Sequence, residues 1–185
     1  MSTSIRSIDQ LNAELAKGAR PKYLYFWGHT PANDGSVTKS CFSQWWVSPF
    51  VIDGITYPTA EHYMMASKAR LFDDQEACER VLTAKHPKQA KEIGRQVKGF
   101  DDAVWKEERF GFVVTGNHAK FSQHADLRYF LLNTGDKVLI EASPYDRIWG
   151  IGLSASDERA EKPSQWRGLN LLGFALMEVR ERLKV

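Results

Sequence analysis

The chain has 185 residues, of which 43% are hydrophobic and 26% charged, and a formal net charge of +2. This composition excludes a disordered or fibrous protein and fits one domain with a substantial core. The net charge is too small to indicate nucleic-acid binding by bulk electrostatics, although a local basic face stays open. The two cysteines lie outside any CxxC or Cys/His ligand spacing, and no run of about 18 apolar residues is present. We therefore expect a soluble protein of the reducing cytoplasm.

The first element predicted along the chain is a short helix. Ser7 followed by Gln10 is a capping-box start, and Gly18 is a suitable C-cap residue. Residues 1–21 are therefore expected to form a helical extension, and residues 22–185 one domain that follows it.

Three segments are predicted to be strands. Residues 22–27 (KYLYFW) are rich in strand-forming side chains, and Asp53-Gly54 lies between two β-branched runs within residues 50–58, the pattern of a hairpin. Residues 137–143 (KVLIEAS) have the same character. We expect a small sheet or hairpin near the N-terminus, before the helices.

After Pro58 the apolar residues recur with the period of a helix. The expected helices span residues 59–71, 75–84, 87–97, 102–121, 124–132 and 169–183. Residues 154–168 are polar and contain a proline, so we expect a loop there. The last helix carries an apolar stripe of Leu169, Leu172, Leu176, Val179 and Leu183 and is predicted to be core.

Glu61 and Lys68 stand out in the helix expected at 59–71. Thr59 is a good N-cap, and Glu61 in the first turn is favoured by the helix dipole. At 100° per residue, however, Glu61 and Lys68 lie within the apolar arc that also holds Met65 and Phe72. An unpaired ion in a dry core costs several kcal/mol, so each of the two needs a partner, a shifted pKa or a water-filled cleft.

The opposite side of this helix carries Tyr63, Ser67 and Arg70, which we expect to form its solvent face. A cleft at the other face would explain Glu61 and Lys68. The alternative is that Lys68 extends to solvent along its methylene stem while Glu61 only caps the helix.

A glycine pattern and the segment just before it are further candidates. Gly150-x-Gly152-x-x-Ala155 has the spacing of a dinucleotide-binding turn, but no amphipathic helix follows it, so we reject a Rossmann site. The glycines more plausibly let the backbone pass close to a ligand or another segment. Asp146 and Trp149 follow a predicted strand, where loops often carry functional groups, although a turn-forming Asp146 is the simpler interpretation.

Several kinds of site are not indicated by the sequence. P-loop, nucleophile-elbow and zincin motifs are absent, and His118 and His124 lack the spacing of metal ligands on one helix face. We therefore expect no metal and no cofactor.

Trp105 could be a core residue or a platform for a flat heterocycle.

Several segments occur in a fixed order along the chain: FSQWW, the DG hairpin, PTAEHY, GR, LLNTG, EASPYDRIWG and NLLGFALMEVR. Together they resemble the NADAR family, also called YbiA-like, over about residues 22–183. The resemblance implies an α+β, predominantly helical fold. It also implies an N-glycosidase that acts on ribosyl-linked heterocycles, either ADP-ribose attached to guanine in DNA or early intermediates of riboflavin biosynthesis.

The resemblance assigns the chemistry to the glutamate of PTxEHY and a following lysine, here Glu61 and Lys68. Glu61 would be the acid/base, and the amine of Lys68 would attack the ring-opened C1 aldehyde to give a Schiff base. The expected substrate-binding residues are Trp105, Asp146, Trp149 and Gly150, with Arg95, Arg128 and Arg147 as candidates for phosphate contacts. For any one of these arginines, simple surface solvation is an alternative.

The sequence also departs from the family pattern. Gln44 stands where asparagine is common, Met64-Met65 replace a Phe-Gln pair, and the segment 28–41 is long. These departures leave the choice of substrate open. The rival interpretation is a sensor that binds ADP-ribose or a related nucleotide without cleaving it, and a structural helical adaptor is a third, less favoured reading.

Overall fold

A computed structural model describes residues 5–184, which form two compact units. The first unit is built from residues 5–43 and 125–184, and the second is built from Gln44–His124. Seven α-helices, four short strands and three 3-10 helices lie in the described residues, so the predicted α+β class with dominant helix is confirmed. No helix among residues 5–184 is long and apolar enough to cross a membrane.

The first unit begins with α1 (Ile8–Ala16), which has the predicted caps. The Ser7 side chain accepts a hydrogen bond from the Gln10 N–H, and Gly18 adopts a φ of +98°, the left-handed conformation that ends many helices. Leu11 on α1 is fully buried.

The sheet of the first unit is a parallel pair, β1 (Tyr23–Phe26) beside β4 (Val138–Glu141). The N-terminal strand therefore does not join the hairpin in one sheet, because its partner comes from more than half the chain away. The side-chain amide of Asn170 binds β4 directly, accepting from the Glu141 N–H at 2.9 Å and donating to the Leu139 carbonyl at 3.0 Å.

The remaining helices of this unit are α6 (Ala125–Leu132) and α7 (Leu171–Leu183), with α7 against β4. The short 3-10 helices are η1 (Lys39–Phe42), η2 (Glu158–Glu161) and η3 (Pro163–Gln165), and the last two lie within the predicted loop. The apolar stripe of α7 is buried as predicted except for Leu169, which precedes the helix and is 43% exposed.

The second unit opens with the predicted hairpin, β2 (Phe50–Ile52) and β3 (Ile55–Tyr57). Its turn residues, Asp53 and Gly54, have φ values of +51° and +76°. Two positive φ values in a two-residue turn match the right-handed twist of a hairpin, which explains the Asp-Gly pair.

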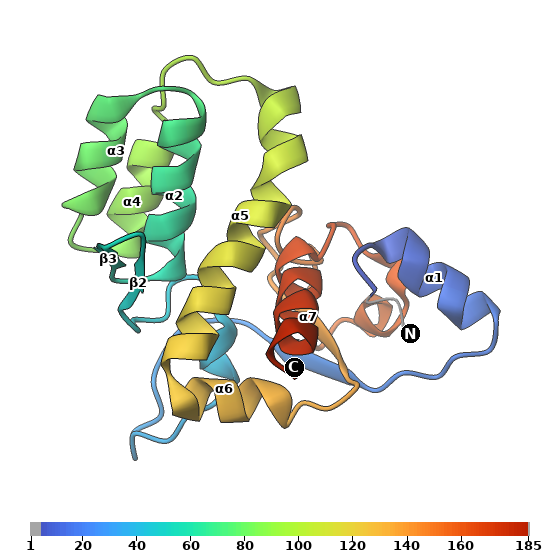
Figure 1. The fold of residues 1–185 in the computed structure, drawn as a ribbon. Coiled ribbons are helices and arrows are strands. Elements are labelled where there is room, and N and C mark those ends of the chain that lie inside the picture. Colours follow the sequence, from blue (N-terminus) through green and yellow to red (C-terminus); the bar gives the residue numbers. More distant parts are fainter. Residues whose placement is uncertain (1–4, 185) are drawn as a thin grey trace. The chain divides into compact units, whose positions relative to one another are not determined.

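The helices of the second unit are α2 (Ala60–Leu71), α3 (Gln75–Leu82), α4 (Pro87–Gly94) and α5 (Asp102–Gln123). Figure 1 shows α2, α3 and α4 side by side, and α2 also packs against α5. All four were predicted, but α4 ends at Gly94, three residues earlier than expected. Helix α2 therefore lies at the centre of this unit.

Candidate functional site

Helix α2 is buried around nearly its whole circumference, and this corrects one prediction. Tyr63 and Ser67, expected to face solvent, are buried, and of the predicted solvent face only Arg70 is exposed. Tyr63 packs against the ring of Tyr57 on β3, and a Cβ added to Gly116 on α5 would lie 2.6 Å from the Tyr63 ring. The hairpin and α5 thus cover the side of α2 that the residue pattern left polar.

Glu61 lies in the first turn of α2, and the residue is only 3% exposed. Its backbone N–H donates to the Gln44 carbonyl at 3.0 Å, which fixes the start of the helix against the segment before the hairpin. The N-cap Thr59 accepts from the His62 N–H. A carboxyl group is therefore held inside the protein at the N-terminus of a helix.

His62, beside Glu61, is a structural residue. It is fully buried, and its Nε2 lies 3.0 Å from the carbonyl of Ala84 while its Nδ1 lies 2.8 Å from the Thr59 hydroxyl. A carbonyl only accepts, so Nε2 carries the proton and Nδ1 accepts from Thr59. Burial lowers the pKa of His62, which keeps this neutral tautomer.

Lys68 lies two turns further along α2 and is half-buried. Its Nζ donates to the carbonyl of Gly94 at 2.8 Å, lies 4.3 Å from the centre of the Phe100 ring, and lies 5.5 Å from that of Trp105. Burial lowers the pKa of this amine from its usual value. The surroundings therefore increase the share of neutral amine, the form that can act as a nucleophile.

The carbonyl that binds Lys68 depends on a glycine. A Cβ added to Gly94 would overlap the Met65 sulfur and lie 2.9 Å from Met65 Cγ. Only glycine lets the end of α4 approach α2 this closely, which places the Gly94 carbonyl beside Lys68. Gly94 is also the last residue of α4, so the contact with α2 lies at the point where α4 ends earlier than predicted.

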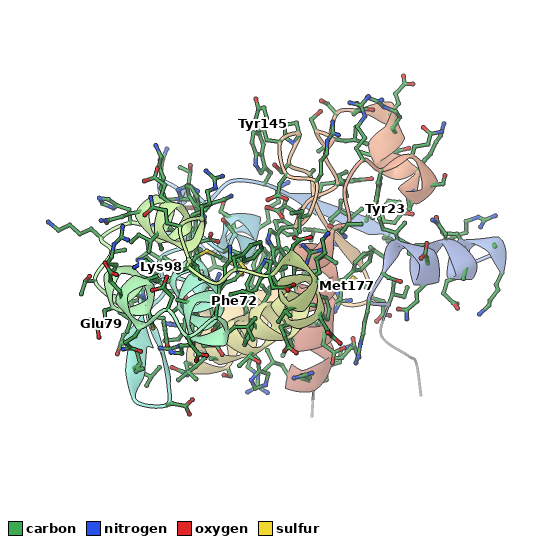
Figure 2. All side chains as sticks on the ribbon, turned by 90° about the horizontal axis from the view of Figure 1, so that it is seen from above. Tyr23, Phe72, Glu79, Lys98, Tyr145 and Met177 are labelled. Atoms are coloured by element: carbon green, nitrogen blue, oxygen red, sulfur yellow. The ribbon has the colours of Figure 1, made fainter. Side chains whose placement is uncertain are left out.

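The aromatic side of the Lys68 environment comes from α5 and the turn before it. Trp105, 8% exposed, stacks on Phe112 with ring centres 6.1 Å apart, and Phe100 contacts Phe72, which is labelled in Figure 2. Asp101 caps α5 by accepting from two backbone N–H groups and so fixes the first turn that carries Trp105. The structure thus brings together Lys68 and Trp105, two of the predicted site residues.

A buried amide pair lies next to the start of α2. The Asn117 side chain donates to the Gln44 side-chain oxygen at 2.6 Å and to the Val113 carbonyl. Gln44 Nε2 and Asn117 Oδ1 are buried and make no further hydrogen bond within residues 5–184. Gln44, which departs from the family pattern, therefore contacts the Glu61 backbone and carries an amide N–H free to donate.

The second unit also contains a hollow of about 490 Å³ near the hairpin. Neither Glu61 nor Lys68 lines it. Its lining comes from the hairpin and from the side of α2 around Tyr63. The lining residues are Ile52, Asp53, Ile55, Tyr57, Tyr63, Ser67, Arg70, Leu71 and Phe112.

In the first unit, Asp146 and Trp149 lie in a tightly hydrogen-bonded turn after β4. Asp146 Oδ1 accepts from the backbone N–H groups of Ile148 and Trp149, both at 2.8 Å, and Ser143 Oγ accepts from the N–H of Asp146. Asp146 therefore forms the turn, as the simpler interpretation held, and it uses Oδ1 to do so. Asp146 and Trp149 both remain partly exposed.

Gly150 packs against backbone. A Cβ added there would lie 2.9 Å from the Glu141 carbonyl and 3.1 Å from the Asp146 carbonyl. The Gly150 carbonyl accepts from the Asn170 N–H just before α7. The prediction that the glycines of this segment allow close backbone approach is confirmed, and the neighbour is another segment of the chain.

The three arginines proposed for phosphate contacts have different surroundings. Arg128 donates to the Leu183 carbonyl at 2.8 Å and so closes the end of α7, while Arg147 and Arg95 are exposed. Phosphate binding by each of them stays a prediction. Within residues 5–184 no three His, Cys, Asp or Glu side chains form a group that could hold a metal ion.

Comparison with known proteins decides the family. The chain matches the NADAR domain over residues 25–184. It belongs to the NADAR family. N-glycosidase R617 of Acanthamoeba polyphaga mimivirus is 41% identical over 165 residues, which cover 86% of this chain and 95% of that protein. N-glycosidase YbiA of Escherichia coli (strain K12) is 34% identical over 146 residues, or 79% of this chain and 81% of that one.

Two further comparisons extend this result. The NMR structure of E. coli YbiA superimposes with a TM-score of 0.71 and 30% identity, covering 90% of this chain and 87% of the other, which confirms the YbiA-like fold. Riboflavin biosynthesis protein PYRR, chloroplastic, of Zea mays is 35% identical over 138 residues, 71% of this chain and 20% of that protein. The predicted family and the predicted enzyme class, a hydrolase of N-glycosyl bonds, are confirmed for this NADAR protein.

Sequence reasoning missed two partners of Lys68 in the NADAR fold. The carbonyl of Gly94 carries no side-chain signal, although Gly94 belongs to the GR motif, and Phe100 lies in a turn that no periodic pattern marks. Both come from segments far from Lys68 in sequence. The glycine of the GR motif could have indicated a close contact between helices, but it was read only as part of the family pattern.

Proposed function

We propose that this protein hydrolyses the N-glycosidic bond between a ribose and a heterocyclic base, with Glu61 and Lys68 as the catalytic residues. The observation that supports this most strongly is the environment of Lys68. The amine is half-buried, is held by the Gly94 carbonyl and faces the Phe100 and Trp105 rings, and burial lowers its pKa. Such an amine is suited to attack on an aldehyde.

The proposed reaction uses the two residues in turn. Cleavage leaves negative charge on the departing base, and Glu61 as acid gives the base a proton when the C1–N bond breaks. The Lys68 amine bonds to C1 as the bond to the base breaks, and the bond between C1 and the ring oxygen then opens to give an imine. Of the two protons that the amine loses, one returns to Glu61 and the other goes to the ring oxygen. Water then adds to the imine, which releases the sugar aldehyde and regenerates the amine.

The other site residues are proposed to bind the substrate. Trp105 and Trp149 would stack the base or an adenine, and Asp146, whose second carboxylate oxygen makes no hydrogen bond within residues 5–184, would bind ribose hydroxyls. Gly150 keeps that turn in place. Arg95, Arg128 and Arg147 remain candidates for phosphate contacts.

Two substrates fit this proposal. One is ADP-ribose attached to guanine in DNA, and the other is an early riboflavin intermediate, 5-amino-6-ribosylaminouracil phosphate. The PYRR relative, named for riboflavin biosynthesis, supports the second. As expected for a chain with only two cysteines, Cys41 and Cys78, we propose the reducing cytoplasm as the site of action.

Incubation with each substrate, with the released base read by mass spectrometry, tests the function and chooses the substrate. We expect base release from one of the two by the wild type and none by Glu61→Gln. Binding with no base released from either substrate would contradict the glycosidase and favour the sensor. Base release by Glu61→Gln at the wild-type rate would remove Glu61 from the chemistry.

A further inference from the structure

Two large aromatic side chains lie next to each other on the surface of the first unit. Trp27 is 55% exposed and Tyr145 is 85% exposed, with ring centres 6.0 Å apart and ring planes tilted by 54°. Figure 2 shows Tyr145 projecting away from its loop. Because the rings are tilted rather than stacked on each other, each keeps an open face. Paired exposed aromatic rings of this kind are typical of a binding surface.

The position of the pair follows from the parallel sheet. Trp27 directly follows β1, and Tyr145 lies in the turn that follows β4. The carboxyl ends of parallel strands meet at one edge, and the Ala142 N–H still donates to the Phe26 carbonyl at 2.9 Å. Ligands of proteins with parallel sheets usually bind beyond this edge.

The turn that carries Tyr145 is firmly held. Ser143 Oγ accepts from the Tyr145 N–H, and the Leu169 N–H donates to the Arg147 carbonyl at 3.0 Å. A ring on a fixed turn loses little conformational freedom when a ligand stacks on it. The hydrogen bonds of the turn therefore hold Tyr145 in its exposed position.

Two arginines lie at the same turn. A Cβ added to Gly152 would lie 3.0 Å from Arg167 Cβ and 3.1 Å from Arg147 Cγ, so the two arginine side chains start close together. Both are exposed, and within residues 5–184 neither makes an ion pair. Arg159, by contrast, is neutralised by Asp157 at 2.6 Å. Arg167 interacts electrostatically with Asp157 without forming an ion pair with it, so Arg147 and Arg167 both keep guanidinium N–H groups for a ligand.

We infer that Trp27, Tyr145, Arg147 and Arg167 form a nucleotide-binding platform. An aromatic ring stacks a nucleobase, and the guanidinium groups pair with the phosphate attached to it. The ligand is a base with its phosphate, either as a free nucleotide or as a unit of a single strand. This rests in part on the proposed function, in which Arg147 is already a candidate for a phosphate contact, and adds Trp27, Tyr145 and Arg167 to that binding site. Binding to the platform does not require that Lys68 forms an imine, so the two proposals can fail separately.

Fluorescence anisotropy with a labelled single-stranded oligothymidylate of about ten nucleotides tests the platform, with unlabelled ADP as a competitor. We expect Trp27→Ala and Tyr145→Ala to weaken binding by about tenfold or more, and Tyr145→Phe to bind like the wild type. The double variant Arg147→Gln/Arg167→Gln should reduce the slope of log affinity against log salt by about 1 to 2.

The two probes distinguish the sources of the ligand. If ADP displaces the labelled oligonucleotide at concentrations similar to those of unlabelled oligonucleotide, the ligand is a free nucleotide. If much more ADP is needed, the ligand is a strand. Either result supports the platform. Tyr129→Ala, on another highly exposed tyrosine, in α6 (72%), and Arg20→Gln are the controls and should bind like the wild type. Wild type that binds neither probe, or equal losses in the control and platform variants, would overturn the inference.

Discussion

Lys68 combines a partly buried stem with polar and aromatic contacts of its amine. Its methylene stem lies on a buried helix, its amine donates to a backbone carbonyl, and two aromatic rings face it. The carbonyl and the rings favour the protonated amine, whereas desolvation disfavours it, and the net result is a lowered pKa. Desolvation is thus the dominant influence on this amine.

The lowered pKa of Lys68 predicts a pH dependence of stability. The folded protein releases this proton at a lower pH than the unfolded chain, whose lysine pKa is near 10.5. Between the two values the unfolded chain carries the additional proton, so the Lys68 contribution to the free energy of unfolding rises with pH and is complete above 10.5. Lys68→Met should remove this rise.

Urea unfolding of the wild type and of Lys68→Met at a series of pH values from about 8 to 11 measures this contribution. Lys88→Met, at an exposed lysine of α4, is the control and should follow the wild type. Parallel pH profiles for all three proteins would show that the pKa of Lys68 is not lowered by folding.

At the scale of elements, the contact between α2 and α4 positions the lysine. Gly94→Ala introduces a Cβ that overlaps Met65, so either the helices separate or Met65 leaves its place. We expect a loss of about 1–3 kcal/mol in the free energy of unfolding. Thermal or urea unfolding measures this loss, and turnover should fall with it because the Gly94 carbonyl moves away from Lys68.

Gly111→Ala is the matched control for Gly94→Ala. Gly111 also lies in a helix, but a Cβ added there meets nothing within 4 Å, so this variant should be neutral or slightly stabilised. Gly94→Ala should cost less in a Met65→Ala background than in the wild type, since that background lacks the overlapping atoms. Equal effects of the two glycine variants would refute the close-packing role of Gly94.

The local signals of the sequence predicted most elements and their starts. Ser7, Thr59 and the Asp53-Gly54 turn act through backbone groups only a few residues away, so their effect can be read from the chain itself. The pairing of β1 with β4 and the early end of α4 depend on distant segments, which no local pattern contains.

In the candidate site too, local features could be predicted from the sequence and contacts between distant segments could not. Glu61 and Lys68 were found because their charge conflicts with the apolar arc of one helix, which is a local property. The burial of Tyr63 was not foreseen, because it depends on Gly116 of α5 and Tyr57 of β3. Asp146 and Trp149 were found from their position after a predicted strand, and a turn-forming Asp146 was foreseen. The family motifs added only their proposed roles in substrate binding.

At the scale of the whole molecule, the N-terminal helix takes part in the core of the first unit. Leu11 is fully buried, and Arg6 pairs at 2.7 Å with Glu178 of α7, a residue that is 5% exposed. Whether residues 1–21 are a separable extension before a domain at 22–185 stays a prediction. These contacts predict that the helix contributes to the stability of the protein.

Leu11→Ala tests this contribution. Removal of a buried leucine side chain should lower the free energy of unfolding by about 2–5 kcal/mol, measured by urea unfolding. Leu169→Ala, at a leucine that is 43% exposed, should cost much less. An unchanged unfolding transition for Leu11→Ala would indicate that residues 1–21 are a separable extension.

Borohydride trapping tests the proposed role of Lys68 most directly. Loss of water between the amine and the C1 aldehyde gives an imine, and hydride transfer to its carbon leaves a stable secondary amine on the lysine. Each protein is incubated with borohydride and whichever of the two substrates the wild type cleaves. The wild type and the control Lys88→Met should carry an adduct that peptide mass spectrometry assigns to Lys68. Lys68→Met should carry none. An adduct that persists in Lys68→Met, or base release by the wild type without any adduct, would contradict the nucleophilic role of Lys68.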